Sequence, residues 1–124
     1  MRRLVFFALR AIASREEVLM LKERVRHVRL AAELRRYVVE IVRRTRSLPA
    51  IQLGCGPRAS IALANAAKAL ALFDGEEYVR PEHLHELAVP VLAHRMVLDP
   101  QAKFAGTTAA SLVADLLREV PVPA

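Results

Sequence analysis

Prolines and glycines divide this sequence into short apolar segments, and this division limits the folds that the chain can adopt. The main breaks fall at Pro49, Pro57, Gly75, Pro81, Pro90 and Pro100. Between these breaks, apolar residues recur three or four positions apart, which is the spacing of one helix face. We therefore expect an all-α fold, a small bundle of about five helices.

Composition agrees with a single helical domain. The chain has 124 residues, of which 54% are hydrophobic, 26% are charged and only four are glycine. This length suits one domain with its own core, and the composition excludes a disordered tail. The single cysteine, Cys55, rules out an intramolecular disulfide, and Arg10 interrupts the N-terminal apolar run too early for a signal peptide. We expect a cytoplasmic protein that does not enter a membrane.

The chain is strongly basic, with a net charge of +6 and an isoelectric point near 10.4. Such a charge admits nucleic acid, an acidic membrane surface or phosphates as partners. Arginines that only keep helix faces solvated give the same total. Trp is absent and aromatic residues make up 5% of the chain, so the sequence lacks the stacking platform of proteins that bind single-stranded nucleic acid.

The chain divides into an apolar and basic segment, residues 1–13, and a helical domain, residues 14–124. We expect segment 1–13 to be either a short docking helix or only a lead into the domain. Ser14 and Glu17 have the spacing of a capping box. The helix that they begin should end near residue 28 or 29 and bury one stripe of apolar residues: Val18, Leu21, Val25 and Val28.

A second helix is expected over about residues 31–47. Its apolar face consists of Leu34, Tyr37, Val38, Ile41, Val42 and Thr45. Arg36, Glu40 and Arg43 form a ladder of opposite charges on another face, which is typical of an exposed helix. A helix that enters a nucleic-acid groove is the alternative, but the acids interleaved with the bases favour a solvated face and argue against nucleic acid as a partner.

The turn around Cys55 opens the next helix and holds the main candidate site. Gly54 and Gly56 allow a tight turn, with Gly56 as the expected N-cap, and Pro57 suits the first helical position. Arg58 then lies at a helix N-terminus, where free N–H groups and the helix dipole favour anions. A guanidinium there adds donors that match a phosphate. The alanine-rich helix that follows should be apolar on most sides and lie at the centre of the bundle.

Similar signals delimit the remaining helices. Gly75 should end the alanine-rich helix in the left-handed conformation, and Pro81 should begin the next helix. Pro90 should break or kink that helix. After a loop, Thr107 or Thr108 should cap the last helix.

No catalytic set stands out in this chain. It contains no Gly-x-x-x-x-Gly-Lys-Ser/Thr phosphate-binding loop. The four histidines, His27, His83, His85 and His94, do not have the spacing of a metal site, and capping or surface roles are expected for them. Cys55 has no histidine at a spacing that indicates a catalytic partner.

Five motifs in a fixed order carry a resemblance to a known family. They are Tyr37–Arg46, Leu53–Ser60, Ala67–Gly75, Tyr78–Leu84 and Val89–Arg95. This order resembles the C-terminal helical lid of MoxR-type AAA+ ATPases and covers residues 14–123. The sequence departs from the family pattern in two respects: Gly56 replaces the usual serine, and the nucleotide-binding core that precedes such a lid is absent from the chain.

The resemblance implies a role for the candidate turn. It places the sensor-2 arginine, which contacts the γ-phosphate of ATP, on Arg58, with Gly54, Gly56 and Pro57 as the supporting turn. ATP and Mg²⁺ would then bind only together with the core, and this chain alone should not hydrolyse ATP. The implied partners are the AAA+ core, neighbouring subunits of a ring and an unidentified substrate protein of a chaperone-like ATPase.

Two other interpretations remain open at the level of sequence. One is a free-standing basic helical module that binds a partner protein or nucleic acid. The other is a chain that associates with itself through the apolar surface that would otherwise pack on a core.

Overall fold

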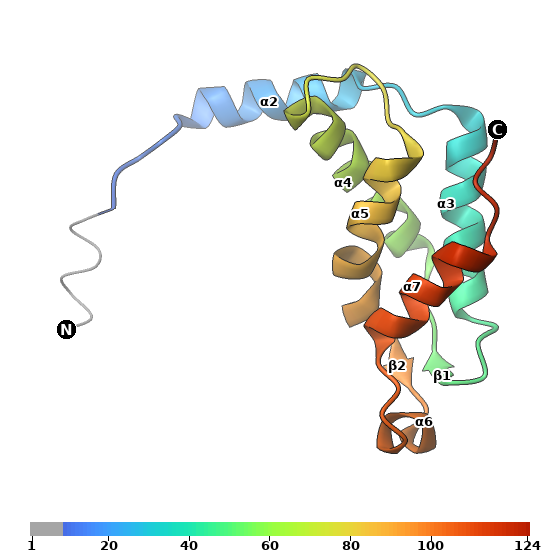
Figure 1. Ribbon diagram of the computed structural model, residues 1–124. Coiled ribbons are helices and arrows are strands. Elements are labelled where there is room, and N and C mark those ends of the chain that lie inside the picture. The colour runs from blue at the N-terminus through green and yellow to red at the C-terminus, as the bar shows by residue number, and fades with distance from the viewer. Residues whose placement is uncertain (1–8) are drawn as a thin grey trace.

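The structure is a computed structural model that describes residues 9–124, and it confirms the predicted all-α bundle (Figure 1). The elements in chain order are α2 (Arg15–His27), α3 (Ala32–Thr45), β1 (Ile51–Leu53), α4 (Pro57–Phe73), α5 (Pro81–Leu92), the 3₁₀ helix η1 (Ala93–Arg95), β2 (Val97–Leu98), α6 (Pro100–Phe104) and α7 (Ala109–Glu119). Every helix within residues 9–124 is too short or too polar to cross a lipid bilayer.

Helix α4 lies at the centre of the bundle, as predicted, and packs against α2, α3 and α5. Its buried residues are mostly small, namely Ala59, Leu63, Ala67 and Ala71, which lets neighbouring helices approach closely. The bundle does not cover every apolar side of this helix, because Ile61 and Phe73 are exposed.

Helix α3 buries the predicted face completely. All six residues of that face are buried: Leu34, Tyr37, Val38, Ile41, Val42 and Thr45. The opposite face carries charges, and Glu40 accepts a 2.8 Å hydrogen bond from Arg44 Nε. Glu40 therefore pairs with Arg44 and not with Arg36 or Arg43, the partners that the sequence indicated.

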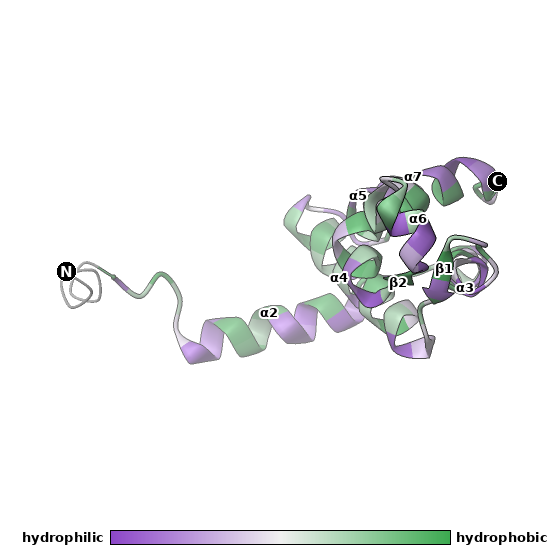
Figure 2. Cartoon of the chain, turned by 90° about the horizontal axis from the view of Figure 1, so that it is seen from below, coloured by the Kyte–Doolittle hydropathy of each residue, from purple (hydrophilic) through white to green (hydrophobic). Residues whose placement is uncertain are grey.

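Helix α2 begins with the predicted capping box and projects away from the bundle (Figures 1 and 2). The Glu17 amide donates to Ser14 Oγ over 3.1 Å. The prediction that its apolar stripe is buried is wrong: no residue of α2 is buried, and Val18 and Leu21 are 47% and 37% exposed. Only Val28, just beyond the helix, reaches the core, because α4 covers only the end of α2 within the described residues.

The N-terminal segment can be tested only in part. Residues 1–8 lie outside the described part of the chain, and residues 9–13 form no helix. Beyond α2, the chain is fixed to the bundle by backbone hydrogen bonds. The Arg29 amide donates to the Glu77 carbonyl over 2.9 Å, and the Val79 amide donates to the Arg29 carbonyl over 2.8 Å. These bonds hold the base of α2 beside the loop between α4 and α5.

The second half of the chain agrees with the predicted helix signals except at one proline. Gly75 is left-handed (φ +78°), Pro81 begins α5 and Thr108 caps α7. Of the predicted break or kink at Pro90, the break does not occur, since α5 continues through this residue to Leu92. Pro90 lies one turn from the C-terminus, so only a short stretch of helix must accommodate the missing N–H group.

A small antiparallel ribbon and a short helix were not predicted. Strand β1 pairs with β2, with Ile51 opposite Leu98 and Leu53 opposite Val97, and α6 follows directly. Strands of two and three residues are too short to give an alternating pattern. The ribbon matters for the site because β1 leads into the turn that precedes α4.

Candidate functional site

The turn from β1 into α4 has the helix-start geometry that the sequence predicts. Gly56 is the N-cap in an extended conformation (φ −96°, ψ −176°), and Pro57 occupies the first helical position. Arg58 follows in the first turn and is exposed to solvent, as expected for the isolated chain. The first turn of this helix has no acidic residue, and Arg58 forms no ion pair within residues 9–124. The exposed Arg58 side chain therefore lies beside a helix N-terminus, where backbone N–H groups lack helical partners.

Gly54 is required by close packing against the end of α3. A Cβ atom at this position would lie 2.7 Å from the N, Cα and Cγ atoms of Arg46. Any larger residue would push β1 and the turn away from α3. Gly56 has no neighbour within 4 Å of such a Cβ, so the space around the N-cap would admit the serine that is usual in the resembled family.

Cys55 is the anchor of the turn. Its side chain is 1% exposed, and its thiol donates a weak hydrogen bond to the Leu92 carbonyl over 3.6 Å. Burial raises the pKa of the Cys55 thiol above its ordinary value, although its hydrogen bond with Thr45 opposes this shift. A buried thiol with a raised pKa is a poor nucleophile, so Cys55 serves to hold the turn.

Two side chains at the end of α3 hold the backbone of Cys55. The Cys55 amide donates to Thr45 Oγ1 over 2.9 Å, and Arg46 Nη1 donates to the Cys55 carbonyl over 3.0 Å. Sequence reasoning assigned Thr45 to an apolar face and gave Arg46 no role at the turn. Their spacing from Cys55 follows no local motif, and the only signal was a polar residue, Thr45, on an otherwise apolar helix face.

His83 and His85 form hydrogen bonds within the fold. His83 is 2% exposed, and its Nδ1 accepts a 3.0 Å hydrogen bond from the Arg80 amide at the start of α5. The proton is therefore assigned to Nε2, which lies 3.2 Å from Asp74 Oδ2 but outside hydrogen-bond geometry. His85 Nε2 bonds to the Tyr37 hydroxyl over 2.8 Å. Within residues 9–124, no group of three His, Cys, Asp or Glu side chains is placed to hold a metal ion.

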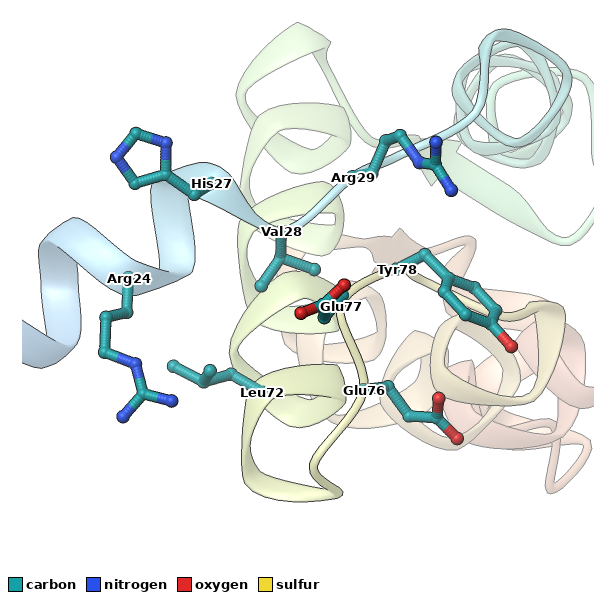
Figure 3. Close-up of a pocket in the computed structure, with 8 residues that line it drawn as sticks. All are labelled: Arg24, His27, Val28, Arg29, Leu72, Glu76, Glu77 and Tyr78. Atoms are coloured by element: carbon teal, nitrogen blue, oxygen red, sulfur yellow. The ribbon is translucent and has the colours of Figure 1, made fainter.

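A groove lies elsewhere on the surface. It has a volume of about 650 Å³ and runs between the end of α2, α4 and the loop before α5 (Figure 3). Basic residues line the side of α2 and acidic residues line the loop: Arg24, Arg29, Glu76 and Glu77. None of the predicted site residues lines this groove, so it is separate from the Arg58 turn.

Comparison with protein families settles what kind of domain this is. The family model described as the AAA lid domain matches residues 43–116, more than half of the chain. The chain belongs to the AAA lid domain family. The match runs from the end of α3 through α7 and includes the whole Arg58 turn.

Relatives of this lid domain are longer proteins. It is 42% identical over 115 residues to the uncharacterized protein YeaC of Bacillus subtilis, a match that covers 93% of this chain and 36% of YeaC. A shorter stretch of 48 residues is 44% identical to Chaperone MoxR1 of Mycobacterium tuberculosis and covers 39% of this chain and 13% of that protein. The chain thus spans about a third, or less, of these relatives.

A solved structure agrees with these relatives. The lid domain superposes along its whole length on the crystal structure of a candidate ATPase from Cytophaga hutchinsonii, with a TM-score of 0.87 and 29% identity, and covers 42% of that chain. Together, the family model, the MoxR1 relative and this structure identify the chain as a lid domain of a MoxR-type AAA+ ATPase. A lid domain associates with a core, which supports the predicted core partner.

Proposed function

We propose that this lid domain closes over ATP bound by a separate nucleotide-binding core and contacts the phosphates through Arg58. The observation that carries the proposal is the position of Arg58 in the first turn of α4, exposed and without an ion-pair partner among the described residues. Its guanidinium provides charge and a fork of donors where the helix N-terminus already favours an anion. ATP and Mg²⁺ belong to the assembled protein, in which the core provides the remaining ligands.

The proposed contact distinguishes ATP from ADP. A guanidinium at the γ-phosphate loses its partner after hydrolysis, so its interaction energy differs between the two nucleotide states. Only such a differential interaction can shift the angle of a lid. In a chaperone-like ATPase, this change of angle would pass the nucleotide state to neighbouring subunits and to a substrate protein.

We further propose that the exposed apolar stripe of α2 contacts the core. Val18 and Leu21 lie three positions apart on one side of the helix, and both stay exposed within residues 9–124. Burial of this stripe would remove apolar surface from water at about 25 cal/mol per Å². In the absence of a core, the same stripe is the surface through which two copies of the chain would associate.

An ATPase assay on a fusion protein tests the role of Arg58. This chain would replace the corresponding region of YeaC, to which it is 42% identical. We expect Arg58→Ala to lower kcat by about 100- to 1,000-fold, as loss of one preorganised donor to the reacting group does in other enzymes. Arg58→Lys should restore part of the activity, since the charge remains but the planar fork is lost.

Two controls make the result decisive. Arg36→Ala removes an exposed arginine from α3 and should leave turnover unchanged. Thermal unfolding of the isolated chain should be the same with and without Arg58→Ala. Unchanged kcat in the Arg58→Ala fusion would refute the proposed phosphate contact, and turnover by the isolated chain that depends on Arg58 would refute the need for a core.

A further inference from the structure

We propose that Thr45 and Arg46 are positioning residues for Arg58. Both side chains extend from the end of α3 to Cys55, which lies three residues before Arg58. Thr45 accepts a hydrogen bond from the Cys55 amide, and Arg46 donates one to the Cys55 carbonyl. The clamp formed by Thr45, Arg46, Gly54 and Cys55 would fix the direction in which α4 presents the guanidinium. Its relevance to phosphate recognition rests on the proposed function of Arg58, whereas its effect on the turn does not.

Thr45 provides the buried half of the clamp. Its side chain is fully buried, and its hydroxyl donates to the Val42 carbonyl over 2.6 Å while it accepts from the Cys55 amide over 2.9 Å. The first bond fixes the rotation of the hydroxyl, so its lone pair points toward Cys55. Since the Cys55 amide is buried, the loss of this acceptor would leave an unsatisfied donor in the core.

Arg46 provides the exposed half of the clamp. Its Nη1 donates to the Cys55 carbonyl over 3.0 Å, and a charged donor makes a stronger hydrogen bond than a neutral one. The side chain can reach this carbonyl because Gly54 lies directly against the Arg46 backbone. The same close approach prevents β1 from sliding along the end of α3.

The held position of Cys55 is passed to Arg58 over a short path. Only Gly56 and Pro57 lie between them, and the ring of Pro57 fixes its own φ angle. The Ala59 amide restrains this path by donating to the Gly56 carbonyl over 3.0 Å. On the far side, Ala59 is 1% exposed and packs into the core. Arg58 is therefore held between two buried residues. In addition, the Cys55 thiol bonds to the Leu92 carbonyl, so a force on Arg58 reaches both α3 and α5.

The clamp explains how a phosphate contact at Arg58 would rotate the whole lid domain as a rigid body. A flexible loop before α4 would absorb a pull from a phosphate locally. A turn bonded to α3 and α5 instead transfers that pull to the helices that form the core, which resist deformation because they are closely packed. We infer that removal of the clamp uncouples the direction of Arg58 from the rest of the lid.

NMR measurements on the full 124-residue chain test the clamp directly. Thr45→Val removes the hydroxyl at nearly constant volume, and Thr45→Ser retains it. In Thr45→Val we expect amide exchange of Cys55 to become roughly tenfold faster or more, because a buried donor loses its partner. Residual dipolar couplings of the Arg58 and Ala59 amides should also change, while Thr45→Ser keeps the wild-type values.

Two further variants separate positioning from general stability. Val38 is buried in α3 about two turns before Thr45, and Val38→Ala should lower stability but leave the Arg58 couplings unchanged. Arg46→Met removes the exposed half and tests the clamp even where Thr45→Val does not fold. Wild-type couplings at Arg58 in both Arg46→Met and a folded Thr45→Val would overturn the proposal.

A titration with inorganic tripolyphosphate separates this inference from the proposed function. In the wild-type chain, we expect the Arg58 Nε signal to shift, and the shift at equal concentration should fall at least about threefold in Thr45→Val. A wild-type chain that does not respond to tripolyphosphate would show that Arg58 needs the core to bind phosphate, and the ATPase assay on the fusion protein then decides its phosphate role. The dipolar couplings would still decide whether Thr45 and Arg46 position it.

Discussion

Helices α2 and α3 have similar sequence patterns but opposite environments. Each carries apolar residues three or four positions apart and begins with an acidic residue in its first turn. Yet α3 buries its whole apolar face, whereas α2 buries none of its residues. The difference is visible in Figure 1, where α3 lies within the bundle and α2 extends away from it.

The comparison shows what helical periodicity can establish. A stripe of apolar residues identifies the face that avoids water, but it does not identify the partner that covers this face. For α3 the covering helices α4, α5 and α7 lie in the same chain. For α2 the described residues contain a cover only at its C-terminal end, so the same pattern becomes a candidate interface.

The largest difference between the two helices should appear in the free energy of unfolding, when one apolar residue of each helix is replaced by alanine. Ile41 of α3 is fully buried, and Ile41→Ala should lower the free energy of unfolding by about 2–5 kcal/mol. Leu21 of α2 is 37% exposed, and Leu21→Ala should change it by less than about 0.5 kcal/mol. Urea denaturation of the isolated chain measures both values. Comparable losses would mean that α2 is covered in solution, as in a self-associated chain.

The difference between α2 and α3 in the stability lost on truncation should become smaller when a core is present. In the YeaC fusion, the α2 stripe would be buried, and Leu21→Ala should then lower stability by about 1.5–3 kcal/mol. Leu19, which is 47% exposed, lies about 160° around the helix axis from Leu21 at about 100° per residue, so Leu19→Ala is the matched control and should have little effect. A Leu21→Ala fusion as stable as its parent would refute the proposed contact between α2 and the core.

Much of the fold was predictable because its determinants are local. Capping residues such as Ser14 and Thr108, the left-handed Gly75 and the proline at the start of α4 each act within one turn of chain. The incorrect predictions concern features that depend on residues far apart in the sequence. The two-residue strand β2 exists only because β1 lies beside it, and α5 passes through Pro90 because its last turn is packed in the bundle.

The site shows the same division. Gly56, Pro57 and Arg58 form a local motif, so their arrangement at the helix start followed from the sequence. Thr45 and Arg46 lie about ten positions before Cys55, and no periodicity links the end of one helix to the loop before the next. Only the fold brings these residues together, so the clamp could not be predicted from spacing.

The smallest expected difference concerns ion pairs on the two helices. On α3, a hydrogen bond from Arg44, helped by its charge and that of Arg43, lowers the pKa of Glu40 below its ordinary value of 4.5. Because the folded pKa is the lower one, the pair stabilises the fold above pH 4.5 and loses this effect as the pH falls through the lowered pKa. Both side chains are more than 40% exposed, so the contribution is small.

An NMR titration of the Glu40 carboxyl group makes this contribution measurable. We expect Arg44→Ala to raise the pKa of Glu40 toward its ordinary value. Arg26→Ala, which removes the 3.4 Å pair with Glu23 on α2, is the matched control and should not change the titration of Glu40. An unchanged Glu40 titration in Arg44→Ala would show that the pair on α3 is as weakly held in solution as its counterpart on the projecting helix.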